Sequence, residues 1–155
     1  MSAIPAVLAT TPTLNQVRQL ESELRELEQV ECPVEHFFSP GMYTRKCSIP
    51  AGSVVVGKMH RHQHPTFLMS GTVRINTDRG METITGPHIW ISQENAKRAL
   101  CTVTDCVFAT VHLNPTETTD LEAIEADVIV PDGLIPHETQ QELSEFAQAL
   151  QEIYA

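Results

Sequence analysis

The chain has 155 residues, a formal net charge of −10 and four cysteines. This length fits one domain with a sizeable core, and no apolar run is long enough to span a membrane. The cysteines lack the paired spacing of a zinc or disulfide framework, which indicates reduced thiols in a cytosolic protein.

The charge is unevenly spread along the chain. Residues 32–115 carry eight Lys or Arg against five acidic residues, whereas from residue 116 onward there are ten acidic residues and no Lys or Arg. Nucleic-acid binding requires a dense basic stripe that contacts phosphates, and the sequence has none. Nucleic acid is therefore not an expected partner.

The first part of the chain divides into an arm and a helix. Residues 1–12 have small side chains, two prolines and no periodicity, which predicts an extended arm. Residues 13–31 are predicted to form an amphipathic helix with Thr13 as its N-cap. Its apolar stripe consists of Leu14, Val17, Leu20, Leu24, Leu27 and Val30. The stripe would pack either on its own domain or on a neighbouring subunit, and the second alternative predicts a homo-oligomer formed through residues 1–31.

Residues 34–114 read as a succession of strands. Short β-branched or alternating runs are separated at intervals of about ten residues by turn sequences, among them Pro40-Gly41 and Ser70-Gly71. Such spacing predicts a β-sandwich or a small barrel.

The acidic segment 116–155 is predicted to be helical. It begins with capping residues near Asp120, has a possible short closing strand at 128–130, and ends in a helix over about 138–154.

The most informative motif is a run of alternating histidines. His60, His62 and His64 would all face one side of an extended backbone, whereas a helix would separate them. The valines at 54–56 and the apolar residues at 67–69 favour a strand. Neutral imidazole is the commonest protein ligand for transition metals, so this run is a candidate metal site.

The segment from residue 57 to residue 113 resembles the cupin family of small antiparallel β-barrels. Cupins have a first motif of two histidines, a glutamate and a downstream glycine. Gly71 matches that glycine, and His64 stands seven residues before it, where the glutamate belongs. His60 and His62 supply the histidine pair. The resemblance implies a mostly β fold with a single cupin-type barrel (jelly roll). The N-terminal helix and the C-terminal helices predicted from periodicity lie outside this segment.

The second cupin motif, Pro-x-Gly-x-x-His, aligns with the stretch QENAKR. Asn95 can adopt the left-handed backbone that glycine normally provides, and Arg98 replaces the histidine ligand. The stretch KRALCTVTDCVFATVHLNP, followed by TDLEAIE, is similar to small cupins often encoded by tailed phages and their bacterial hosts.

Three interpretations of the histidine cluster follow. In the first, a divalent transition metal (Fe, Zn or Mn) binds to nitrogens drawn from His60, His62, His64 and His112. In the second, the pocket holds no metal, and Lys58 and Arg98 help to bind a carboxylate or phosphate. In the third, the histidines only form hydrogen bonds within a scaffold.

Two functions are compatible with these features. One is an oligomeric binding or assembly protein, acting in the cytoplasm or in a phage particle assembled there, with phage structural proteins as partners. The other is a metal-dependent oxygenase, isomerase or lyase, in which Arg98 would hold the carboxylate of a small substrate. The absent glutamate and the Arg98 replacement favour the first function, and the histidine cluster favours the second.

Overall fold

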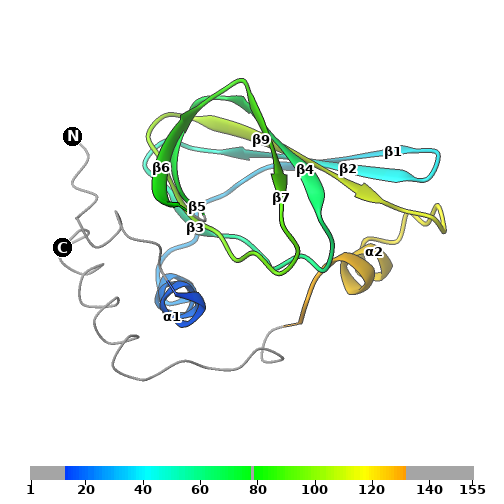
Figure 1. Ribbon diagram of the computed structural model, residues 1–155, viewed down its shortest axis with the longest axis horizontal. Helices are drawn as coiled ribbons and strands as arrows, with labels where there is room; N and C mark the ends of the chain where they lie inside the picture. Colours follow the sequence, from blue (N-terminus) through cyan, green and yellow to red (C-terminus); the bar gives the residue numbers. More distant parts are fainter. Residues whose placement is uncertain (1–12, 78, 132–155) are drawn as a thin grey trace.

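The computed structural model describes residues 13–77 and 79–131, and two antiparallel sheets dominate this part of the chain (Figure 1). The five-stranded sheet has the order β1 (Val34–Ser39), β2 (Met42–Ile49), β9 (Cys106–Leu113), β4 (His64–Ser70), β7 (His88–Ser92). The four-stranded sheet has the order β3 (Val54–Val56), β8 (Ala99–Thr102), β5 (Thr72–Thr77), β6 (Gly80–Thr85). The predicted mostly β, antiparallel jelly-roll architecture is confirmed.

The main core lies between the two sheets. The strands alternate, so every second side chain points inward. Leu68 of β4 and Val73 of β5 have no exposed surface, although they belong to opposite sheets. The buried members of this core are Ile49, Leu68, Val73, Ile75, Cys106 and Phe108. The four cysteines are not joined in disulfides.

Helix α1 (Leu14–Arg25) packs on the barrel of its own chain. Thr13 caps it, and the predicted N-cap is confirmed. Val17 and Leu20 are buried against a second apolar cluster at β3 and β8. The side chain of Lys97, which is 4% exposed, forms an ion pair of 3.0 Å with Glu21. These contacts favour the first of the two alternatives for the helix.

The helix is shorter than predicted. It ends at Arg25 instead of residue 31, and Leu27 and Val30 of the predicted stripe are 63% and 52% exposed. The glutamates that follow oppose continuation, because negative charge near a helix C-terminus interacts unfavourably with the helix dipole. The Gln29 side-chain amide also donates a hydrogen bond of 2.9 Å to the carbonyl oxygen of Leu24.

Helix α2 (Leu121–Val128) closes one end of the five-stranded sheet (Figure 1). Asp120 caps its first turn, and Ile124 is buried against Tyr43 of β2. The closing strand predicted at 128–130 is reduced to a single bridge between Ile129 and His60. The predicted arm and the final predicted helix lie outside the described residues. Neither α1 nor α2 has the length and apolarity needed to cross a bilayer.

Candidate metal centre

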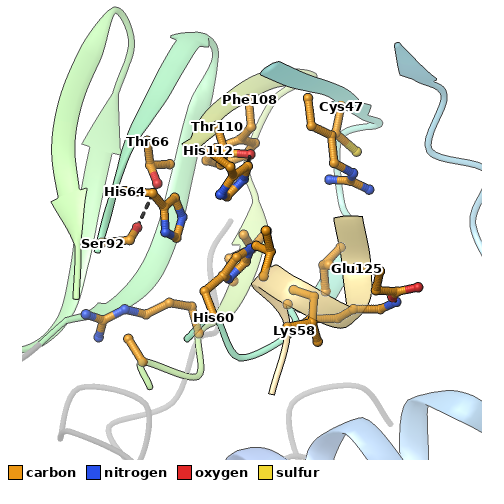
Figure 2. A pocket seen from close by; sticks show the side chains of 18 of the residues that line it. Cys47, Lys58, His60, His64, Thr66, Ser92, Phe108, Thr110, His112 and Glu125 are labelled. Atoms are coloured by element: carbon orange, nitrogen blue, oxygen red, sulfur yellow. Dashed lines mark hydrogen bonds and ion pairs between the residues drawn. The ribbon is translucent and has the colours of Figure 1, made fainter. Parts of the chain in front are cut away.

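Three histidines converge inside the barrel. His60, His64 and His112 each present a ring nitrogen, and these nitrogens all lie within 4.8 Å of one another. The ring centroids are 4.3 Å apart for His60 and His64, 4.7 Å for His64 and His112, and 5.2 Å for His60 and His112. Figure 2 shows the three rings turned towards a common centre.

Strand register explains two of the three positions. Thr66 of β4 lies opposite Thr110 of β9 in the antiparallel pair. Two residues further along each strand, His64 and His112 therefore share the same inner face. Tyr43 of β2 lies opposite His112, and its ring stacks on the imidazole with centroids 6.0 Å apart. Both histidines are buried, at 5% and 7% exposure.

The prediction that the alternating run is one strand is wrong. Only His64 belongs to β4, and the chain bends at residues 61 and 62. Main-chain contacts replace the strand pairing: the Arg61 amide donates to the carbonyl of Val128 at 2.8 Å, and the Asn95 amide donates to the carbonyl of His60 at 2.8 Å. The bend brings the His60 ring back over His64 and leaves His62 exposed and outside the cluster.

Hydrogen bonds on the second ring nitrogen orient two of the rings. His64 Nδ1 lies 3.2 Å from the carbonyl oxygen of His62, to which it donates, so Nε2 is left for a ligand. His112 Nε2 lies 2.9 Å from Thr110 Oγ1, which leaves Nδ1. Histidines that bind metals are commonly held by such a partner. His62 thus acts through its backbone, and the side-chain role predicted for it falls to the other three.

Burial keeps the cluster neutral. Desolvation, as the largest cause, and the charge of the neighbouring His64, as the second, lower the pKa of His60 to about 4. The same causes, together with His60, lower the pKa of His112 to about 3. Desolvation also lowers the pKa of His64. At neutral pH all three rings are therefore uncharged, which is the form that binds a metal ion.

These pKa shifts predict a stability loss on acidification of the metal-free protein. An unfolded histidine titrates near pH 6.5, whereas the folded His60 titrates near 4, so between these values the unfolded chain binds more protons. The free energy of unfolding should then fall with decreasing pH, by up to about 1.4 kcal/mol per pH unit for each such histidine. Urea denaturation between pH 7 and 5 measures the slope. His112→Gln should flatten it, and exposed His62→Gln should not; equal slopes in all three proteins would contradict the assignment.

The donor set fits a first-row divalent ion such as zinc or iron. Around a tetrahedral ion with bonds of ~2.1 Å, ligand nitrogens lie roughly 3.4 Å apart, so modest side-chain movements would complete the site. Among residues 13–77 and 79–131, no carboxylate belongs to the cluster. A bound ion would therefore keep open positions for an external ligand, as catalytic sites do.

The cluster faces a cavity of about 520 Å³. The predicted anion-binding residues Lys58 and Arg98 both line it. However, Lys58 Nζ forms an ion pair with Glu125 Oε1, and Arg98 Nη1 donates to the carbonyl of Asn76 at 3.1 Å. Both cations predicted to bind the anion are therefore already engaged.

Sequence reasoning missed two charged residues of the cavity, Arg45 and Glu125. Arg45 follows Tyr43 at the strand period, and this alternation in β2 could have revealed it. No local pattern distinguishes Glu125 from the other acids of its segment, because only the docking of α2 brings it to the cavity.

The backbone conformation expected of Asn95 in the aligned second motif is confirmed. Asn95 has a φ of 59° and provides the left-handed turn before β8. Gly71 has a φ of 96° in the turn between β4 and β5. Arg98, three residues after Asn95, is not a member of the histidine cluster, and His112 on β9 takes part instead.

A scan against protein-family models finds no match, and a search of curated protein sequences finds none either. Solved structures do match. Ectoine synthase from P. lautus has a TM-score of 0.51 at 15% identity, over 70% of this chain and 86% of that one. A cupin superfamily protein from Desulfitobacterium hafniense has a TM-score of 0.43 at 13% identity, over 56% and 83%. KdgF from Halomonas sp. has a TM-score of 0.48 at 10% identity, over 61% and 88%. At these identities the likeness concerns the fold.

Proposed function

Since this chain has the cupin fold, we propose that it holds one divalent transition metal ion and acts with it on a small carboxylate. The observation that carries this proposal is the convergence of three neutral, largely buried imidazoles, those of His60, His64 and His112, on one side of a cavity. The reaction class would be an oxygenase, isomerase or lyase. When bound, the ion would polarise a carbonyl group or activate oxygen.

The protein's own residues would orient and shield the substrate. The walls of the cavity are largely apolar, with side chains such as Ile75, Leu100 and Phe108, and they would exclude water from the reacting atoms. On β4 and β7, in the same sheet as β9, the hydroxyls of Thr66 and Ser92 share a hydrogen bond of 2.7 Å and offer polar contacts near His64 (Figure 2).

Metal analysis of protein purified without chelator tests the proposal. Near-stoichiometric iron, zinc or manganese is expected, and it should disappear in a His60→Ala, His64→Ala double variant. Sub-stoichiometric metal in the unmutated protein, persisting after incubation with each ion, would overturn the proposal.

A second candidate function, an assembly protein, is supported by the outer face of the five-stranded sheet. Register places Phe67, Ile89 and Ala109 in one row across this face and Pro65, Ile91 and Val111 in the next. Several large apolar side chains here are exposed: Phe37, Met42, Ile89, Ile91 and Leu113. Contiguous exposed apolar surface of this kind marks interaction sites.

We propose that a second copy of the chain covers this outer sheet face. Two chains of net charge −10 repel each other, so contact costs least where charge is sparse. The outer face satisfies that condition: among its described residues the ionic groups are Glu35 and Lys46, which pair with each other at 3.4 Å. Such an oligomer would suit the phage-associated role that the resemblance implies, with phage structural proteins as further partners.

The mass of the assembly, measured by light scattering on two variants, distinguishes an oligomer contact on the outer sheet face from one in residues 1–31. Ile89→Lys, in the middle of the outer sheet face, should halve the mass of the assembly. Leu27→Lys, in the exposed segment after α1, should leave it unchanged. Deleting residues 1–31 is a poorer test, because Val17 and Leu20 of α1 are part of the core. If Leu27→Lys lowers the mass and Ile89→Lys does not, the contact lies in residues 1–31.

A further inference from the structure

The cavity is a positive region in an acidic protein. Among the described residues that line it, the ionic side chains are those of Arg45, Lys58, Arg98 and Glu125. Three cations thus face one carboxylate, while the chain as a whole carries −10. A bound divalent cation would add to this excess. A cavity with such a balance attracts a ligand of negative charge.

The three cations are not equally available to that ligand. Lys58 is occupied by the ion pair with Glu125, and Arg98 donates to a backbone carbonyl. Arg45 differs from both, because no hydrogen bond or ion pair joins its side chain to another residue in the described part of the chain. More than a third of its surface is accessible, although it lies among residues that line the cavity.

Strand geometry directs Arg45 into the cavity. Its neighbours at the strand period, Tyr43 and Cys47, line the cavity too, as expected for one face of β2. Its cross-strand partners are His36 on β1 and Thr110 on β9, which also line it. Thr110 in turn is hydrogen-bonded to His112. On the inner face of the β2–β9 ladder, the Arg45–Thr110 pair is therefore next to the Tyr43–His112 pair, which contributes His112 to the histidine cluster.

We infer that Arg45 is the residue that binds the carboxylate of a small organic acid while the far end of the acid faces the histidine cluster. This inference rests on the proposed function for the substrate class, and it moves the anion contact from Lys58 and Arg98 to Arg45. A guanidinium suits the task, because its planar fork can donate two parallel hydrogen bonds to one carboxylate.

One further feature agrees with this assignment. On the inner face of the β2–β9 ladder, Tyr43 and Phe108 stand on either side of the Arg45–Thr110 pair, and both aromatic rings line the cavity. These rings fit an acid with a short apolar body.

Calorimetry on zinc-loaded protein tests the inference with succinate and benzoate as probes, each compared with its amide. At least one acid should bind tenfold or more tightly than its amide. Arg45→Gln should weaken binding of that acid about tenfold to hundredfold and leave its amide unaffected. Arg45→Lys should give an intermediate loss, because it keeps the charge but not the fork. Arg79→Gln, at the exposed turn before β6 and outside the cavity lining, is the matched control and should leave binding of the acid and its amide unchanged.

The inference is overturned if neither acid is preferred over its amide, or if Arg45→Gln and Arg79→Gln behave alike. Zinc content, measured on the same samples, keeps this result separate from the proposed function. Full zinc occupancy with no effect of Arg45→Gln would reject only the Arg45 assignment. An acid preference that depends on Arg45 in a protein without zinc would reject only the metal centre.

Discussion

Replacing His112 by alanine is expected to abolish stoichiometric metal binding. His112 supplies one of three nitrogens, and in the described chain no carboxylate stands in the cluster to compensate for its loss. Loss of a residue that only hydrogen-bonds to a metal ligand already lowers metal affinity about 10–100-fold. Loss of a ligand itself should therefore lower metal affinity at least about 100-fold. Competition with a chromogenic chelator, followed by mass spectrometry of the bound metal, measures the change.

His62→Ala is the matched control for this experiment. It removes an imidazole from the same sequence motif, but its side chain is exposed and outside the cluster. Its contribution to the site is the carbonyl that accepts the hydrogen bond from His64, and alanine retains that carbonyl. Affinity within about threefold of the unmutated protein is therefore expected. Equal losses in the two variants would mean that metal binds at the surface, through the motif and not through the converging rings.

The histidine motif shows how far local patterns predict a site. His60 and His64 were correctly placed together, but for the wrong reason: the alternation predicted a strand, and the structure has a bend anchored to α2. His112 is more than forty residues away in sequence and reaches the cluster only through the pairing of β9 with β4 and β2. Sequence indicated that its ring could turn inward. The register of the sheets was needed to place it.

The fold was more predictable than the cavity. Strand periodicity and turn residues are local signals, and they predicted a succession of strands over residues 34–114, where β1 to β9 lie. The C-terminal end of α1 was missed, because the apolar spacing continues to Val30 while the charges and Gln29 end the helix earlier. The roles of Glu125 and Lys97 depend on helix docking, and no periodic pattern carries that information.

Gly71→Ala is expected to cause the largest loss of stability of any conservative substitution discussed for the barrel. Gly71 turns the chain from β4 to β5 with a φ of 96°, a conformation that costs a side-chain-bearing residue about 1–2 kcal/mol. In addition, an added Cβ would lie 2.2 Å from the carbonyl oxygen of Asp105 and 2.8 Å from Cys106 Sγ. The first of these is backbone and belongs to the turn that begins β9.

Relief of this clash would require β4 and β9 to separate, and β9 carries His112. We therefore expect Gly71→Ala to lower the free energy of unfolding by more than about 3 kcal/mol, in the range of severe core overpacking. Gly52→Ala is the matched control: its φ of 73° imposes similar strain, but nothing lies within 4 Å of the added Cβ. It should cost only about 1–2 kcal/mol. Equal losses for both variants, by urea denaturation, would show that backbone strain alone is responsible and that the contact with β9 gives way without cost.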